Sequence, residues 1–108
     1  MSSYPAKLDS FDDFYIVSSG LAVSETTNNV YNTSLFENLS PETVPPSFRA
    51  MVANRLAEDG RHWTRLFEKH NSGTYNNQWV VIDYNKIKVT TDGVQLANET
   101  FWMLEQMP

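Results

Sequence analysis

Two adjacent threonines end a run of strand-forming residues near the N-terminus. Residues 21–27 read LAVSETT, so Thr26 and Thr27 follow Glu25 at the end of this run. Hydroxyl groups at a strand end can point into a cleft, where they orient a substrate or a neighbouring catalytic group. Threonine is also common in strands because its branched side chain suits an extended backbone. Thr27 is therefore a candidate site residue, with ordinary strand propensity as the alternative.

A second candidate is the amide-rich segment NSGTYNNQW at residues 71–79. We expect it to join a helix to a strand, and Asn71 or Gly73 can adopt the left-handed conformation that closes a helix. Three consecutive side-chain amides each offer two donors and one acceptor: Asn76, Asn77 and Gln78. Such amides can pin neighbouring loops, or they can donate to a developing oxyanion. The first interpretation, a hydrogen-bonded connector, is favoured.

Other arrangements that could do chemistry are weak. The sequence has no cysteine, so it holds no thiol nucleophile, thiolate metal site or disulfide. Its two histidines, His62 and His70, are not spaced as a metal-binding pair and are interpreted as surface residues. Asp12 and Asp13 could work as a carboxylate pair, but a solvated strand start is favoured. No nucleotide or zinc-protease motif occurs, and we expect no cofactor and no metal.

The bulk composition limits the class of protein. The 108 residues fit one small domain or part of a larger one, and 41% of them are hydrophobic. A net charge of −5 argues against a nucleic-acid partner, which needs a basic face. No apolar run approaches the roughly 18 residues of a membrane span, so no transmembrane segment is expected. The first ten residues lack the apolar core of a signal peptide.

Strands are predicted towards both ends of the chain. Residues 10–27 read as two short strands around Ser18-Ser19-Gly20 or as one long bent strand, and residues 78–84 (QWVVIDY) as one strong strand. Residues 85–93 read as a polar connection that ends in an Asp-Gly turn. Residues 94–107 read as one or two further strands, with four side chains expected to be buried: Phe101, Trp102, Met103 and Leu104.

Two amphipathic helices are predicted between these strands. Apolar residues recur at helical spacing in residues 47–59 and again in residues 61–70. Pro46 or Ser47 is a credible first position, Gly60 is expected to stop the first helix, and Asp59 can cap the second. The order is then β-β-α-α-β-β, an α+β arrangement. Because two short helices can cover only part of the apolar strand faces, we expect residues 1–108 to be an internal fragment of one larger layered domain.

Several segments resemble the phospholipase B-like family, in the family's order along the whole chain. They are SSYP at 2–5, DDFYIVSSGL at 12–21, ETT at 25–27, VANRLAEDG at 52–60, NSGTYNNQWVVIDY at 71–84 and LEQMP at 104–108. NSGTYNNQW followed by a strand is the most specific of them. Residues 28–44 and 86–99 are less alike, as is usual for surface connections.

The resemblance implies a fold and a chemistry that this chain would supply only in part. The family is similar to N-terminal-nucleophile hydrolases, which are four-layer αββα sandwiches. A precursor cleaves itself to expose a cysteine, whose thiol attacks an acyl carbonyl while the freed α-amino group serves as base. That cysteine and a following histidine fall outside this sequence. Family members are lysosomal or secreted glycoproteins, described as amidases or as lipases that degrade phospholipids at their acyl esters.

The resemblance also implies roles for particular residues. The second threonine of ETT, Thr27, maps onto a family active-site position and would line the cleft beside the missing thiol. Asn71, Asn76 and Asn77 are second-choice site residues, as support or as oxyanion donors. A secretory location would also give meaning to three N-glycan acceptor patterns, at Asn32, Asn38 and Asn98.

The sequence therefore predicts part of a carboxylic ester hydrolase that is inactive alone. Its partners would be the remainder of the parent chain and a phospholipid or other acyl substrate. The alternative is a non-catalytic interaction module that keeps the same framework and binds a partner through exposed apolar sheet surface. A third interpretation, an unrelated cytosolic α+β domain, would make the ordered set of motifs a coincidence.

Overall fold

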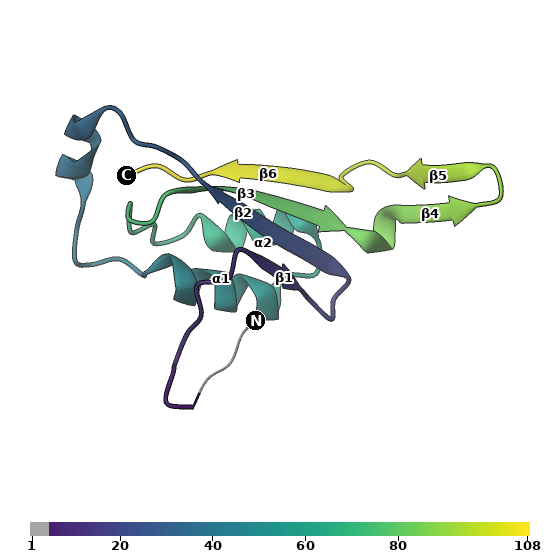
Figure 1. The fold of residues 1–108 in the computed structure, drawn as a ribbon, viewed down its shortest axis with the longest axis horizontal. Coiled ribbons are helices and arrows are strands. Elements are labelled where there is room, and N and C mark those ends of the chain that lie inside the picture. The colour runs from purple at the N-terminus through teal and green to yellow at the C-terminus, as the bar shows by residue number, and fades with distance from the viewer. Residues whose placement is uncertain (1–4) are drawn as a thin grey trace.

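Four strands form one antiparallel sheet in the computed structural model, which describes residues 5–108 (Figure 1). They are β1 (Phe14–Ile16), β2 (Leu21–Thr27), β3 (Asn77–Asp83) and β6 (Phe101–Glu105), in the order β1-β2-β3-β6. The two strands predicted around Gly20 and the strong strand that follows NSGTYN are confirmed as β1, β2 and β3. Residues 2–4 of the SSYP segment lie outside the described residues.

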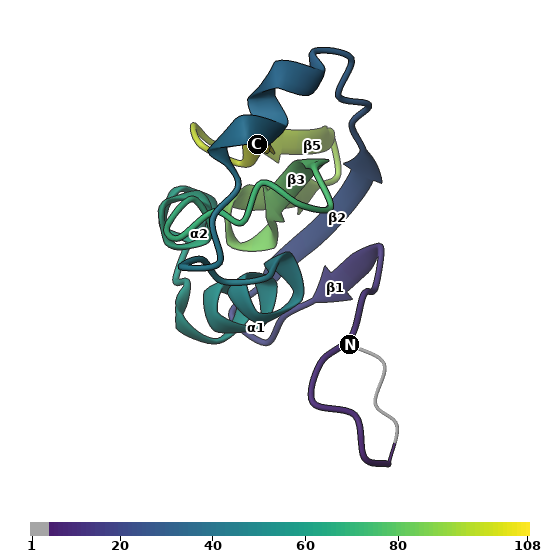
Figure 2. The same ribbon diagram turned by 90° about the vertical axis from the view of Figure 1, so that its left-hand side faces the viewer.

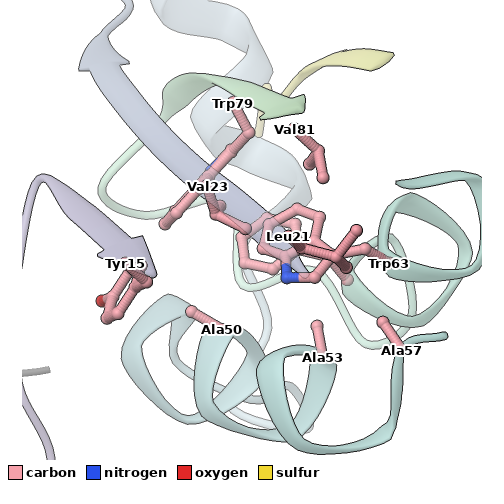
Figure 3. Close-up of a cluster of buried hydrophobic side chains, with 10 residues drawn as sticks. Tyr15, Leu21, Val23, Ala50, Ala53, Ala57, Trp63, Trp79 and Val81 are labelled. Carbon is pink, nitrogen blue, oxygen red and sulfur yellow. The ribbon is translucent and has the colours of Figure 1, made fainter. Parts of the chain in front are cut away.

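Both helices, α1 (Pro46–Leu56) and α2 (Gly60–Phe67), lie on the same face of this sheet (Figure 2). Trp79 and Val81 point from β3 into the layer between sheet and helices. There Trp63 stacks on Phe67 with ring centroids 4.9 Å apart, and Phe67 lies 4.7 Å from Trp79. The core residues of α1 and its C-cap are small, which lets the helix approach closely (Figure 3): Ala50 and Ala53 in the helix and Ala57 at the cap.

The opposite face of the sheet carries apolar side chains that no other described residue covers as a layer. Ile16, Ala22, Ile82 and Phe101 are cross-strand neighbours that form one row across it. Ile16 is 71% exposed and Phe101 is 54% exposed. We call this surface the open face and define it by its seven apolar residues: Phe14, Ile16, Ala22, Val80, Ile82, Phe101 and Met103.

The described chain thus has two layers. Its shortest dimension is 19 Å, which fits one sheet and one helix layer. Four layers of about 10 Å each would need about 40 Å. The mixed helix and sheet content agrees with the predicted α+β class. The expectation that residues 101–104 are all buried is wrong, because strand alternation turns Phe101 and Met103 to the open face and only Trp102 and Leu104 to the helices.

Residues 85–93, predicted to be a polar connection, include strand structure instead. After the short 3₁₀ helix η2 (Tyr84–Lys86), β4 (Ile87–Thr90) pairs with β5 (Gly93–Leu96) in a hairpin that extends beyond the sheet (Figure 1). The predicted turn is confirmed, with Gly93 at φ 133°. Polar residues such as Lys88 alternate with apolar ones such as Val89, and this alternation is the strand signal that the polar composition hides. Residues 28–44, described above as a surface connection, also contain a 3₁₀ helix, η1 (Thr33–Asn38).

The observed boundary between the two helices differs from the expected one at Gly60. Gly60 begins α2 rather than stopping α1, which already ends at Leu56. A Cβ atom at Gly60 would lie 2.8 Å from Cδ1 of Trp102, so glycine allows β6 to pack against the start of α2. Asp59 caps α2 as predicted, and its carboxylate accepts a hydrogen bond from the His62 backbone N–H at 2.7 Å.

Candidate functional site

Three strand ends meet at one end of the sheet. β2 ends at Thr27, β3 begins at Asn77, and Gln106 follows the end of β6. Thr27 is the cross-strand partner of Asn77, and the backbone N–H of Gln106 donates to the Asn77 carbonyl at 2.9 Å. We call these three residues the polar sheet end. They come from ETT, NSGTYNNQW and LEQMP, so the fold makes neighbours of three segments that are distant in the sequence.

Thr27 and Asn77 point to the same side of the sheet and are close neighbours there. The backbone N–H of Asn28 donates to the Asn76 carbonyl at 2.9 Å. The adjacent pair, Thr27 and Asn77, is therefore of the non-hydrogen-bonded type, in which the Cα atoms are only about 4.5 Å apart. Thr27 is exposed and Asn77 is buried. A group that binds at Thr27 from solvent would thus lie one side chain away from the Asn77 amide.

Asn71 and Asn76 are used to fasten the connector between α2 and β3. The Asn71 Nδ2 donates to the Met107 carbonyl at 2.7 Å, and its Oδ1 accepts from Nη1 of Arg49 at 3.0 Å. The Asn76 Nδ2 donates to the Gly73 carbonyl at 2.9 Å. These bonds fit the support interpretation for both amides. Asn77 differs, because its Nδ2 and Oδ1 are buried without a hydrogen-bond partner in the described part of the chain.

Left-handed backbone conformations shape this connector. His70, rather than Asn71, takes the left-handed conformation directly after α2, at φ 56°. Gly73 follows at φ 67°, where a Cβ atom would lie 2.7 Å from Cδ2 of Leu39 and 2.8 Å from Cα of Pro108. Glycine is therefore required both by the conformation and by the packing of LEQMP against the turn. Tyr75 also has a positive φ, 52°, which is uncommon for a side chain of this size.

A buried arginine that the sequence analysis did not single out holds the start of the connector. The Arg49 guanidinium donates through Nε to the Lys69 carbonyl at 3.1 Å, and through Nη2 to the Phe67 carbonyl. These acceptors lie at the C-terminal end of α2, where positive charge suits the helix dipole. Burial lowers the pKa of Arg49 to about 10, so the side chain stays protonated at neutral pH. Its sequence signal is weak, since one arginine in a helix normally indicates an exposed face.

Acidic and phenolic groups gather beside the polar sheet end. The Tyr75 hydroxyl donates to Oε1 of Glu25 at 3.5 Å. Burial, followed by the negative charge of Asp13, raises the pKa of Glu25 above its ordinary value. Burial, followed by the charge of Asp12, raises the pKa of Tyr15 to about 12. Burial and then the charge of Glu25 raise the pKa of Tyr75. Burial is the largest cause of all three shifts, and a neighbouring negative charge is the second.

The two histidines lie in and after α2, and Asp13 joins the strands through its backbone. His70 is exposed after α2, and His62 is half-buried on the helix. Within residues 5–108, no three His, Cys, Asp or Glu side chains are grouped as metal ligands would be. The Asp13 carbonyl accepts hydrogen bonds from the Glu25 backbone N–H at 2.8 Å and from Oγ of Ser24 at 3.2 Å, so its backbone joins the strands.

The three glycan acceptor patterns lie in surface segments. Asn32 caps η1, and its Oδ1 accepts from the Ser34 backbone N–H at 3.2 Å and from the Ser34 hydroxyl at 2.7 Å. Asn38 ends η1, and Asn98 lies between β5 and β6. All three asparagines are exposed. In the Asn98 pattern, the hydroxyl of Thr100 donates to the Ala97 carbonyl at 2.6 Å.

Comparison with known proteins decides the family. The Phospholipase B family profile matches residues 1–108. The chain belongs to the phospholipase B family. This phospholipase B chain is 54% identical over 108 residues to "Putative phospholipase B-like 2" of Caenorhabditis elegans. It is 47% identical over 107 residues to "Phospholipase B-like 1" of Homo sapiens, and 45% identical over 107 residues to "Phospholipase B" of Crotalus adamanteus.

These matches cover nearly all of this chain but only a small part of each relative. Each covers 99% of this phospholipase B chain, but only 18% of the C. elegans relative and 19% of the other two. The chain thus spans about a fifth of the length of the relatives it matches. Among the helices of the described residues, none is long and apolar enough to cross a membrane.

Proposed function

We propose that this chain is an internal part of a phospholipase B-like hydrolase that cleaves the acyl ester or amide bonds of phospholipids or related substrates. The observation that carries the proposal is the meeting of ETT, NSGTYNNQW and LEQMP at the polar sheet end of a family member. The names of the relatives support the hydrolase class. Residues 1–108 would then be one segment of a larger domain.

In this proposal the reaction is acyl transfer to a cysteine followed by hydrolysis. The chain contains no cysteine, so the thiol must come from another part of the parent protein. Thr27 would line the cleft and orient the acyl group or the nucleophile through its hydroxyl. The Asn77 amide, one side chain away, would support that position or donate to the oxyanion that forms on the acyl carbonyl. Asn71 and Asn76 would hold the connector in place through their side-chain hydrogen bonds to backbone carbonyls.

The open face supports the fold that goes with this mechanism. In a four-layer αββα sandwich, each sheet packs one face on helices and the other on the second sheet. Ile82 and Phe101 occupy the face that would meet the second sheet, while Trp79 and Val81 already meet the helices. We therefore infer that the second sheet of the parent covers the open face.

The proposed route of the parent protein is the secretory pathway, ending in lysosomes or outside the cell. The surface positions of Asn32, Asn38 and Asn98 support this proposal, because a glycan at each would extend into solvent. The acidic net charge of −5 is compatible with an acidic compartment.

Replacing one threonine of ETT at a time tests the function. In the full-length parent, Thr27→Val should lower kcat for phospholipid or amide hydrolysis by about 10-fold to 1,000-fold if its hydroxyl acts on the reacting groups. Thr26→Val is the matched control, because Thr26 points to the other face of the sheet, paired with Gln78. Equal activity of the two variants would contradict the role of Thr27.

Purified residues 1–108 alone should hydrolyse none of these substrates, since the thiol is absent. Activity of the isolated chain that Thr27→Val abolishes would overturn the proposed need for the parent. The second candidate function is a non-catalytic interaction module, and the exposed open face is the observation that favours it. A full-length parent that carries no cysteine near the polar sheet end would support the module.

A further inference from the structure

Two buried side-chain amides at the polar sheet end carry atoms without a hydrogen-bond partner in the described part of the chain. Asn77 is 0% exposed, and neither Nδ2 nor Oδ1 has a hydrogen bond within residues 5–108. Gln106 is 3% exposed, and its Nε2 donates to the Thr74 carbonyl at 3.0 Å, but its Oε1 has no partner there. An unpaired buried polar atom normally costs about 1–3 kcal/mol. Three such atoms in neighbouring residues therefore indicate that another group belongs between them.

The positions of the two amides limit where this group can lie. Asn77 and Gln106 are opposite each other in β3 and the continuation of β6, joined by the backbone bond from Gln106 N–H to the Asn77 carbonyl. In such a pair the Cα atoms are about 5.5 Å apart and both side chains leave the sheet on the same side. The bond from Gln106 Nε2 to Thr74 directs that nitrogen to the connector, which leaves Oε1 as the free end.

The free atoms also limit the chemistry of the group. Asn77 Nδ2 needs an acceptor, whereas Asn77 Oδ1 and Gln106 Oε1 need donors. A carboxylate or phosphate oxygen cannot donate, and an ammonium group cannot accept. A water molecule can accept from Asn77 Nδ2 and donate to both oxygens, and a buried water typically makes about three such bonds. A side-chain hydroxyl can accept from Asn77 Nδ2 and donate to one of the two oxygens.

We propose that Asn77 and Gln106 bind one hydroxyl-type group, a water molecule or a side-chain hydroxyl of the parent chain, beneath Thr27. The bound group holds the Asn77 amide in one orientation. The amide in turn orients the Thr27 side chain, which would line the cleft. Asn77 is then a positioning residue and Gln106 its partner. The part that concerns Thr27 rests on the proposed hydrolase function, whereas the bound group does not.

A crystal structure of the full-length parent tests the bound group directly. We expect oxygen density within about 2.7–3.2 Å of both the Asn77 amide and Oε1 of Gln106. Isolated density identifies a water, and density continuous with a Ser, Thr or Tyr identifies a parent side chain. A direct bond between the two amides, or an apolar side chain packed between them, would overturn the proposal.

A double-mutant cycle in the full-length parent tests the sharing of this group. Asn77→Leu and Gln106→Met each leave the other amide and the bound group incompletely paired, whereas the double variant removes both needs. We expect the double variant to lose less melting temperature than the two single losses added together. Additive losses would show that the residues bind nothing in common. The wild-type density still decides the matter if a variant fails to fold.

Kinetics separate positioning from general support. Asn77→Leu should lower kcat about 10-fold or more with little change in KM, while the melting temperature changes moderately. Asn85→Leu is the control, since the Asn85 amide donates to the Ser19 carbonyl at 2.8 Å at the opposite end of the sheet. Its kcat should be unchanged. An unchanged kcat in Asn77→Leu would overturn the positioning role. A wild-type parent that hydrolyses no acyl substrate would instead refute the proposed function and leave the bound group to the other two tests.

Discussion

The two faces of β3 have similar side chains and different surroundings. Trp79 and Val81 are buried against α1 and α2, whereas Val80 and Ile82 reach the open face and are half-buried. A strand that is apolar on both sides is typical of a sheet covered on both sides. In the described residues the helices cover one of these two apolar faces, so burial stabilises the sheet mainly from the helix side.

The largest expected difference between the two faces comes from removing one large ring from each. Trp63→Ala should destabilise the fold by about 3–5 kcal/mol, because its ring packs on Phe67 and Trp79 and leaves a cavity there. Phe101→Ala, on the open face of the isolated chain, should cost much less, since Phe101 is already exposed to water. Urea unfolding followed by circular dichroism would measure both. Equal losses would mean that the open face is covered in solution.

A charge on the open face should have opposite effects in the isolated chain and in the full-length parent. In the isolated chain, Ile82→Lys should reduce self-association, because it interrupts the apolar row that includes Ile16 and Phe101. In the full-length parent the same lysine would be buried against the second sheet and should destabilise it by several kcal/mol. Sedimentation velocity and thermal unfolding would measure the two effects. An isolated chain that is strictly monomeric before the change would contradict the first expectation.

The smallest effect concerns pH and a carboxyl on the helix-covered side. The pKa of Glu25 is raised in the folded chain, so folding favours its protonated form. Its unfavourable contribution is therefore absent at low pH and develops as the pH rises through the folded pKa. Glu25→Gln should raise the melting temperature slightly at pH 7, and the gain should vanish below about pH 4, under the ordinary glutamate range. Glu105→Gln, from the other side of the sheet, controls for the loss of one charge, and an equal gain there would contradict the assignment to Glu25.

Much of the fold follows from local patterns. The β-branched and aromatic run at residues 78–84 predicts β3, Pro46-Ser47 predicts the start of α1 to within one residue, and Asp59 predicts the cap of α2. Each of these signals acts within a few residues, so the sequence alone is sufficient to find it. The expectation that Gly60 stops the first helix is wrong. Its role depends on close packing against Trp102, a residue from the other end of the chain.

The candidate site was only partly predictable for the same reason. Thr27 and Asn77 could be named from their motifs, but their pairing depends on the register between β2 and β3. Gln106 joins them through β6, and nothing in LEQMP by itself indicates a buried amide with a free oxygen. The difference between Asn76 and Asn77 is a matter of which neighbour each meets, which residue type does not encode.

β3, β4, β5 and β6 form one continuous antiparallel hairpin, and its register affects how the sheet assembles. The bonds from Ala97 N–H to the Lys86 carbonyl and from Asp83 N–H to the Thr100 carbonyl connect the β4–β5 ladder to the β3–β6 ladder without a slip. Pairing can therefore extend inward from the turn at Gly93, and each step closes only a small loop. β2 meets β3 only after the long segment that carries both helices has been closed. The β2–β3 pairing, which brings Thr27 next to Asn77, therefore closes the longest loops in the sheet and carries its largest loop-closure entropy cost.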